Sequence, residues 1–198
     1  KDREGGIWIG SYFGGVNYYP RFYTYFEKYY PKGTDNGLHG KRVREFCQDN
    51  QGILWIGTED GGLNRFNPKT KTFSFFTPRS AFTNVHGLCL IDNSVFSICR
   101  TTTGDIYLGT LFGLLRYNRQ SDDFDRIPEL NGRFVYDIKE DSGGNLWLAT
   151  YANGAYCYNV SEKKWKNYLH DENNPKSLPY DKVLSIFEDS HRQIWLTT

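Results

Sequence analysis

The sequence contains no methionine, 7 prolines and 4 cysteines among its 198 residues. It has no apolar run approaching the roughly 18 residues that a membrane-spanning helix needs. Its first residues show no charged segment followed by an apolar one, which is the pattern of an export signal. The sequence therefore shows no candidate membrane span, and without an initiating methionine we expect it to be a piece of a longer protein.

An excess of charge of one sign is also missing. Lysine and arginine number 24 and aspartate and glutamate 23, so the formal net charge is +1. No basic stretch reaches the density typical of a nucleic-acid-binding surface. We therefore expect no DNA or RNA partner for this chain.

The four cysteines, Cys47, Cys89, Cys99 and Cys157, are separated by 42, 10 and 58 residues. These separations match neither zinc-ligand nor redox spacing, so we predict small buried apolar side chains. Cys47 and Cys99 occupy the same place in two successive repeats, which leaves a disulfide between neighbouring strands open.

Histidines are as scattered as the cysteines, and none pairs with a second histidine or a carboxylate at metal-ligand spacing. The four are His39, His86, His170 and His191. We expect neither a metal ion nor a cofactor.

Aromatic residues and glycine are abundant instead. Phenylalanine, tryptophan and tyrosine make up 17% of the chain, glycine occurs 20 times, and the mean hydropathy is −0.64. This mixture is typical of many short β-strands joined by glycine turns rather than of a helical bundle.

An internal repeat organises these residues. Its anchor is an aromatic residue that recurs at steps of 47, 52, 40 and 48 residues: Trp8, Trp55, Tyr107, Trp147 and Trp195. Six residues before each anchor stand Asp2, Asp49, Thr101, Asp141 and Asp189, and three before stand Gly5, Gly52, Gly104, Gly144 and Arg192. Aspartate bonds a backbone N–H two residues on and glycine tolerates positive φ, so this spacing predicts a tight turn inside a hairpin.

Apolar runs flank each turn, and two further runs follow it in each repeat. The first strands are expected at residues 43–47, 95–99, 135–139 and 183–187, and the second strands, buried on both faces, at residues 7–10, 54–58, 106–110, 146–150 and 194–198. Third strands are expected at residues 16–19, 63–67, 114–118 and 155–159, with fourth strands such as residues 72–76 and 165–168.

Four strands in a period of about 47 residues predict an all-β fold, a β-propeller fragment of four-stranded antiparallel blades in an incomplete ring. The fixed phase of the repeat disfavours a β-sandwich or a single barrel. We divide the chain into residues 1–42, 43–94, 95–133, 134–182 and 183–198, where the first segment holds strands two to four and the last holds strands one and two.

The repeat resembles the two-component regulator propeller repeat of hybrid two-component sensors from gut anaerobic bacteria. Two segments carry this resemblance, residues 49–68 (DNQGILWIGTEDGGLNRFNP) and residues 174–189 (NPKSLPYDKVLSIFED). The third repeat departs from the family pattern, with Thr101 in place of aspartate and the sequence LFGL at residues 111–114.

The resemblance implies a role that composition alone does not indicate. In that family the propellers form a periplasmic sensor region, followed by a β-sandwich, a membrane span and a histidine kinase. It implies that this chain binds a glycan-derived oligosaccharide, adjoins the remaining blades and the β-sandwich of the same parent chain, and works in a homodimer.

Candidate ligand residues lie in the loops that join second to third strands and just before the first strands, because both groups reach one face of a propeller. Aromatic rings there can stack on sugar rings, and polar groups can fix the hydroxyls. The loops supply Tyr12, Phe13, Glu59, Asp60, Phe112, Tyr151 and Asn153. The connectors supply Lys41, Arg42, Arg133 and Lys182, which suit a carboxylate or sulfate and so favour an acidic sugar.

Two other functions remain open. Propellers also serve as glycoside hydrolases and lyases, but no catalytic trio can be named here, and adjacent acids such as Asp122 and Asp123 point apart on a strand. The sialidase Asp box also places its tryptophan five residues after the aspartate, whereas here the interval is six. The second alternative is a propeller for protein docking or dimerisation, without a small ligand.

Overall fold

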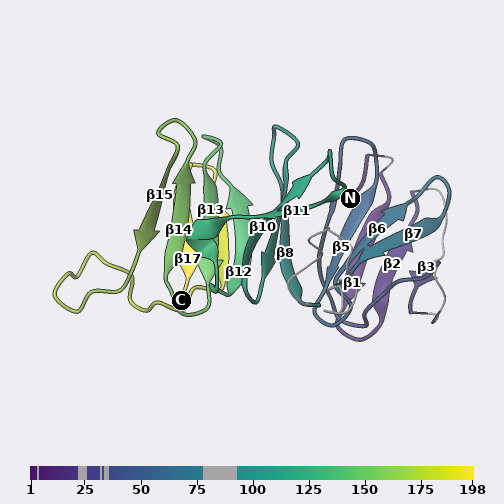
Figure 1. Ribbon diagram of the computed structural model, residues 1–198, viewed down its shortest axis with the longest axis horizontal. Coiled ribbons are helices and arrows are strands. Elements are labelled where there is room, and N and C mark those ends of the chain that lie inside the picture. Colours follow the sequence, from purple (N-terminus) through teal and green to yellow (C-terminus); the bar gives the residue numbers. More distant parts are fainter. Residues whose placement is uncertain (4, 22–25, 32, 34–35, 78–92) are drawn as a thin grey trace. The chain divides into compact units, whose positions relative to one another are not determined.

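Short antiparallel strands account for the regular structure of this chain, for which we analysed a computed structural model (Figure 1). The structure describes residues 1–3, 5–21, 26–31, 33, 36–77 and 93–198. His86 and Cys89 lie outside these described residues. The chain forms two units, Lys1–Ile98 and Cys99–Thr198.

The first unit contains two sheets whose strands are neighbours in chain order. The first sheet is β1-β2-β3, with β1 Ile7–Ser11, β2 Gly15–Tyr19 and β3 Glu27–Tyr29. The second sheet is β4-β5-β6-β7, with β4 Val43–Gln48, β5 Leu54–Thr58, β6 Leu63–Asn67 and β7 Thr72–Phe76. Strand β8, Val95–Arg100, spans the boundary between the two units.

The second unit repeats this pattern. Strand β8 is followed by β9 Ile106–Thr110, β10 Gly113–Asn118 and β11 Asp123–Arg126 in the sheet β11-β10-β9-β8. A 3-10 turn, Pro128–Leu130, leads to β12 Val135–Glu140, β13 Leu146–Thr150, β14 Ala155–Asn159 and β15 Lys164–Tyr168, which lie side by side in chain order (Figure 1). A two-stranded sheet of β16 Ser185–Glu188 and β17 Ile194–Thr197 ends the chain.

The repeated turn has the predicted geometry. Asp49 Oδ1 accepts hydrogen bonds from the backbone N–H groups of Gln51 at 2.8 Å and Ile53 at 3.0 Å. Gly52 adopts a φ of +83°, and Arg192 takes the same left-handed region, with a φ of +63°, where the fifth repeat lacks glycine. The aspartate-glycine spacing therefore forms a tight turn, as expected.

The sheets pack through two different faces. In the first unit Trp8, on one face of its sheet, packs with Leu54, Ile56 and Phe66 of the next sheet. In the second unit Leu146 and Leu148 of β13 belong to one apolar core with Cys99 and Leu114 of the preceding sheet. Each described interface thus joins the face that carries the aromatic anchor to the face that carries aliphatic residues.

Burial of the second strands on both faces is confirmed for β5 and wrong for the first and last sheets. All five residues of β5 are buried. Ile7 and Ile9 of β1 are 45% and 44% exposed, and Trp195 of β17 is 58% exposed. Among the described residues of each unit, no further sheet covers these faces. In the two strands, more exposed residues therefore alternate with more buried ones, and neither strand is buried on both faces.

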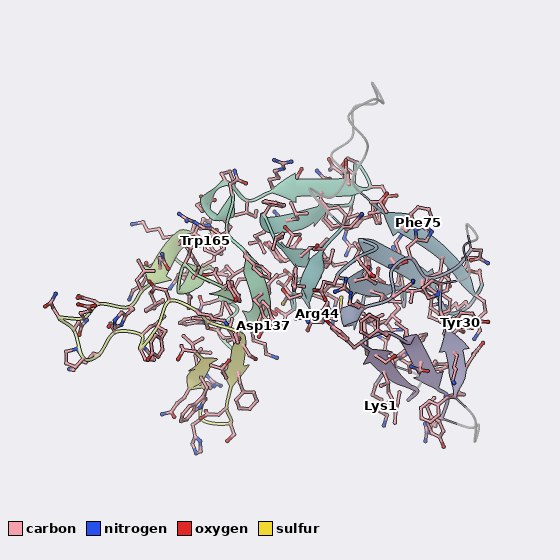
Figure 2. The ribbon with its side chains drawn as sticks, turned by 90° about the horizontal axis from the view of Figure 1, so that it is seen from below. Lys1, Tyr30, Arg44, Phe75, Asp137 and Trp165 are labelled. Carbon is pink, nitrogen blue, oxygen red and sulfur yellow. The ribbon has the colours of Figure 1, made fainter. Side chains whose placement is uncertain are left out.

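Carboxylates on the first strands bond the first strand of the following sheet. At the β-bulge in β4, Glu45 Oε2 accepts from the backbone N–H of Ile98 at 2.8 Å. At the corresponding bulge in β12, Asp137 Oδ2 accepts from the N–H of Ile186 at 2.7 Å. Figure 2 shows Asp137, on β12, at one edge of its sheet and Trp165, on β15, at the other edge.

Cys47, Cys99 and Cys157 are present as thiols, so the structure does not use the conceivable bridge between Cys47 and Cys99. Burial raises the pKa of the Cys157 thiol to about 11. Within the described part of the chain, no helix has the length and apolar character needed to cross a membrane.

Candidate functional site

Five of the predicted ligand residues come together in the first unit. Arg42 Nη1 lies 3.6 Å from Glu59 Oε1, and Arg42 Nε lies 3.8 Å from Asp60 Oδ2. The Arg42 guanidinium also lies 6.0 Å from the ring centroid of Phe13, whose ring meets that of Tyr12 edge-on at 4.8 Å. We call Tyr12, Phe13, Arg42, Glu59 and Asp60 the Arg42 cluster.

Two glycines allow the connector before β4 to approach the loop after β5. Gly40 has a φ of +89°, and a side chain on Gly61 would meet the backbone N of Gly40 at 2.2 Å. Because the two backbones lie this close, Asp60 Oδ1 accepts from the N–H groups of both Lys41, at 2.9 Å, and Arg42, at 3.2 Å. The loop acid therefore fixes the connector that carries both cations.

Two carboxylates face one guanidinium inside the Arg42 cluster. A hydrogen bond with Tyr12 raises the pKa of Arg42 further, and the carboxylates of Glu59 and Asp60 add to this effect. Glu59 Oε2 is buried and has no hydrogen-bond partner among the described residues. Since two carboxylates already face the guanidinium, this cluster is better suited to hydroxyl groups than to an anion.

Aromatic rings and a lysine form a second group in the second unit. The ring of Tyr151 stacks on Phe134 at 5.4 Å with an interplanar angle of 22°, and Phe134 lies 5.4 Å from Tyr136. The Lys182 ammonium lies over Tyr151, with Nζ 4.5 Å from the ring centroid. We call Phe134, Tyr136, Tyr151 and Lys182 the Tyr151 cluster.

Backbone pairing positions the Tyr151 cluster. The N–H of Tyr151 donates to the carbonyl of Phe134 at 3.0 Å, which places the loop after β13 beside the connector that enters β12. Tyr151 remains 43% exposed. The carboxylate of Asp181, which precedes Lys182, accepts from the N–H of His170 at 2.7 Å.

The remaining predicted residues of the second unit lie on loops and connectors of the same two kinds, and their described hydrogen bonds are made by backbone groups. Gly132 donates to the carbonyl of Phe112 at 2.8 Å, and Asn153 donates its N–H to Thr150 Oγ1 at 3.0 Å. Arg133 is exposed, and its N–H donates to the carbonyl of Leu130. The described contacts thus join Tyr151 and Lys182 but not Phe112, Arg133 or Asn153.

Phe134 and Tyr136 were missed by the sequence analysis, which considered cations rather than rings at the start of the first strands. Both flank Val135, a fully buried residue of the repeat. On a strand, the two neighbours of an inward-facing residue share the opposite face. An aromatic pair around this valine was therefore the available signal.

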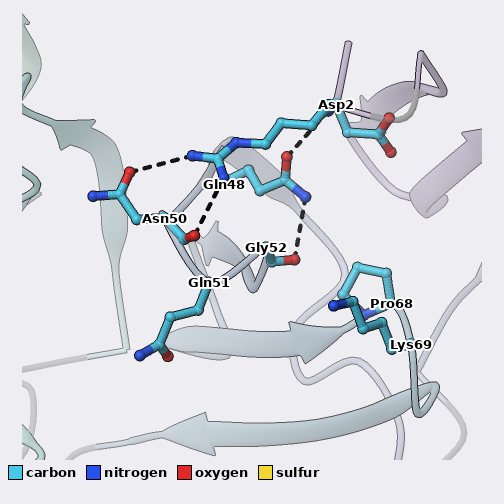
Figure 3. Close-up of a pocket in the computed structure, with 8 residues that line it drawn as sticks. Asp2, Gln48, Asn50, Gln51, Gly52, Pro68 and Lys69 are labelled. Atoms are coloured by element: carbon cyan, nitrogen blue, oxygen red, sulfur yellow. Dashed lines mark hydrogen bonds between the residues drawn. The ribbon is translucent and has the colours of Figure 1, made fainter.

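A different hollow lies at the opposite end of the sheets of the first unit, by the aspartate turns (Figure 3). It encloses about 220 Å³ and is lined by polar groups. Arg3 Nη1 donates to the carbonyl of Asn50 at 3.2 Å, and Gln48 Oε1 accepts from the N–H of Arg3 at 3.3 Å. Because these groups bond one another across two sheets, we interpret this hollow as a structural contact.

Asn64 also has a structural role. This fully buried side chain donates from Nδ2 to the carbonyl of His39 at 2.8 Å and accepts from the His39 N–H at 2.7 Å. It holds the connector that leads to Lys41 and Arg42.

Comparisons with known proteins agree with this architecture. An extracellular domain assigned to a one component system of B. thetaiotaomicron superposes with a TM-score of 0.79 at 22% identity, covering 98% of this chain and 25% of that one. An extracellular domain assigned to a hybrid two component system of the same organism gives 0.78 at 22% identity, covering 99% and 26%. The chain is a segment of a β-propeller.

Two stretches of the chain match a known repeat family, and one curated relative is similar to part of it. Residues 37–60 and 129–152 match the family described as two component regulator propeller. Histidine kinase P4 of Formosa agariphila is 29% identical over 94 residues, which is 45% of this chain and 7% of that protein. The chain thus spans about a quarter or less of the length of these relatives.

The fold occurs in enzymes too. Virginiamycin B lyase from Staphylococcus aureus superposes with a TM-score of 0.68 at 16% identity and 98% coverage of this chain. Likeness at this level shows the fold alone.

Proposed function

We propose that this chain is a ligand-sensing propeller segment in the periplasmic sensor region of a hybrid two-component system, where it binds a glycan-derived oligosaccharide. The Tyr151 cluster is the observation that supports this proposal most directly. It combines the ring of Tyr151, which is 43% exposed, with a cation at the end of the sheet where second-to-third-strand loops meet connectors. Exposed aromatic rings can stack on the apolar side of sugar rings.

An acidic sugar fits the second unit better than the first. In the Arg42 cluster Glu59 and Asp60 already face the guanidinium. Lys182 makes its described side-chain contact with the ring of Tyr151, and exposed Arg133 lies on the adjoining connector. We infer that the carboxylate or sulfate of an acidic ligand binds at Lys182, and that the Arg42 cluster by itself suits neutral, hydroxyl-bearing sugars.

Calorimetric titration of the full chain tests this proposal with matched neutral, uronic-acid and sulfated oligosaccharides. We expect Tyr151→Ala to weaken binding about tenfold, and Lys182→Gln to weaken the acidic ligands more than the neutral ones. Lys176→Gln, in the exposed connector before β16, is the matched control and should leave binding unchanged. Equal affinity of all four proteins for every oligosaccharide would remove the Tyr151 cluster from the proposal.

The same experiment separates the alternatives. A sensor binds its ligand without consuming it, so chromatography of the ligand after incubation should recover it intact; turnover would instead indicate a propeller hydrolase or lyase. Self-association without ligand binding would indicate a docking propeller. We further propose that the signal passes to a histidine kinase of the parent protein, through the remaining blades, the β-sandwich and a homodimer.

A further inference from the structure

A second hollow, in the second unit, lies between the sheet that contains β9 and β10 and the sheet that contains β13, β14 and β15. It encloses about 290 Å³, close to the lower end of the range of about 300 to 1,000 Å³ typical of small-molecule sites. Three aromatic rings line it, those of Tyr107, Tyr158 and Trp165. We call it the Trp165 pocket.

In the first unit, aromatic rings occupy the equivalent position. In the first unit, strand register pairs Leu54 with Phe66, and Phe66 with Phe73. In the second unit it pairs Leu146 with Tyr158, and Tyr158 with Trp165, so Phe66 corresponds to Tyr158 and Phe73 to Trp165. In the first unit Trp8 stacks on Tyr18 at 4.4 Å. Tyr29 approaches Phe66 at 4.8 Å and so fills the space between the two sheets.

Two substitutions between repeats open the pocket. Tyr18 pairs with Trp8, and Arg116 pairs with Tyr107, so Arg116 occupies the position of Tyr18. Tyr29 pairs with Val16, and the N–H of Ile127 donates to the carbonyl of Leu114, so Ile127 occupies the position of Tyr29. Arg116 is directed to Asp105, with Nη2 2.9 Å from Oδ1. The two tyrosine rings that fill the first interface are therefore absent from the second.

The lysine of the third-to-fourth-strand turn differs in the same way. Lys71 Nζ donates to Glu27 Oε2 and to the Tyr29 hydroxyl, both at 2.8 Å, which closes the first interface. Lys163 occupies the equivalent turn position, with the same left-handed backbone, φ +53° against +58° for Lys71. Lys163 lines the Trp165 pocket together with Glu129 and Arg116.

The chemistry of the lining selects a ligand class. Three rings offer flat apolar surface, and one carboxylate and two cations offer acceptors and donors around it. Asp105 pairs with Arg116, and the lining has one further cation, Lys163, and one carboxylate, Glu129, so the formal charges sum to zero and an anion gains little net attraction. A neutral pyranose suits this lining, because its C–H face stacks on aromatic rings and its hydroxyls both donate and accept.

We propose that the Trp165 pocket is a binding site for one neutral pyranose ring, separate from the Tyr151 cluster and independent of the function proposed above. The ring comes either as a free monosaccharide or as one unit of a longer glycan. The pocket specifies a single ring because its volume is close to the lower end of the range for ligand sites.

Nuclear magnetic resonance of the full chain tests this proposal with methyl glucopyranoside, methyl galactopyranoside and methyl mannopyranoside as probes. The indole N–H resonance of Trp165, assigned by its loss in Trp165→Phe, should shift saturably with at least one probe. A matched oligosaccharide of the same sugar distinguishes the two sources: tighter binding than the methyl glycoside indicates a glycan unit, and equal binding a free monosaccharide. A Trp165 resonance that shifts with none of these probes overturns the proposal.

The repeat itself supplies the decisive variant. Arg116→Tyr combined with Ile127→Tyr restores the two rings of the first interface and should reduce binding at least tenfold while the protein stays folded. Glu129→Gln, at an exposed rim residue, should weaken binding severalfold without changing the packing. Unchanged binding in both variants overturns the site.

Tyr151→Ala distinguishes this proposal from the preceding one. It should leave the pyranoside shift at Trp165 unchanged, whereas Arg116→Tyr with Ile127→Tyr should leave binding of acidic oligosaccharides unchanged. If either variant lost both the pyranoside shift at Trp165 and the binding of acidic oligosaccharides, the two sites would not be independent and this proposal would be overturned.

Discussion

Trp55 donates its indole N–H to Oδ2 of Asp49 at 2.9 Å, and both residues are almost fully buried. The same bond joins Trp8 to Asp2, Trp147 to Asp141 and Trp195 to Asp189, each at 2.8 Å. Where the third repeat has tyrosine in place of tryptophan, it also has Thr101 in place of aspartate, whose hydroxyl accepts from the N–H of Asp105. Aspartate and tryptophan thus form one structural unit of the repeat.

Removing this carboxylate should be costly where it is buried. Asp49→Ala leaves the Trp55 indole N–H and the turn N–H groups without acceptors, and we expect a loss of about 2 to 4 kcal/mol in the free energy of unfolding. Urea denaturation followed by tryptophan fluorescence measures this loss. Asp189→Ala is the control: Trp195 is 58% exposed, so water replaces the acceptor and the loss should be clearly smaller. Equal losses in the free energy of unfolding for the two variants would contradict the argument that burial makes the Asp49 hydrogen bond costly to remove.

Stability should fall in acid partly through Asp141. Burial alone would raise the pKa of Asp141, but hydrogen bonds from Asn145, Trp147 and Gly143 outweigh it and lower the pKa overall. A lowered pKa in the folded state contributes stability above the unfolded value of about 4 and loses it as the pH falls through the folded value. The urea midpoint should therefore drop from pH 5 towards pH 2.

Asp141→Asn is the control for this pH dependence. It should be less stable at pH 7 and show a shallower loss between pH 5 and pH 2, because the titrating group is gone. An unchanged slope would show that other carboxyl groups cause the acid sensitivity.

The carboxylate of Asp137 should anchor the last hairpin. Its Oδ2 accepts from the N–H of Ile186 and its Oδ1 from the N–H of Ile138, at 2.7 and 2.9 Å. Asp137→Ala should cost about 1 to 3 kcal/mol and speed hydrogen exchange at Ile186 and along β16. Asp137→Asn retains one acceptor, so its stability and its hydrogen exchange should lie between those of the unchanged protein and those of Asp137→Ala. Unchanged exchange at Ile186 in Asp137→Ala would contradict this anchoring.

The left-handed turn lysines should respond differently to glycine. Lys163 adopts a φ of +53°, a conformation that costs a side-chain-bearing residue roughly 1 to 2 kcal/mol, so Lys163→Gly should raise the free energy of unfolding by about 0.5 to 1 kcal/mol. Lys71→Gly relieves the same strain but loses the bonds to Glu27 and Tyr29, so its net gain should be smaller. Thermal denaturation of both variants measures the difference, and a larger gain for Lys71→Gly would contradict the bridging role.

Much of the candidate site could be predicted because the repeat assigns each loop to an end of its sheet. Tyr12, Phe13, Arg42, Glu59 and Asp60 were expected in such loops and are in mutual contact. The pairing of Arg42 with both carboxylates was not expected, because it depends on how closely Gly40 and Gly61 approach each other. Lys182 was predicted as a cation for a ligand, but its contact with Tyr151 depends on backbone pairing between Phe134 and Tyr151.

The amino-acid sequence by itself determined the strands, the aspartate turns and the blade period, since these follow from local alternation and from the backbone preferences of aspartate and glycine. Only the tertiary structure decided which rings meet across the sheets. Tyr18 and Arg116 occupy the same register position, yet one fills its interface while the other turns to Asp105 and leaves the Trp165 pocket. Packing between sheets depends on side-chain volumes from residues distant in the chain, which no local pattern encodes.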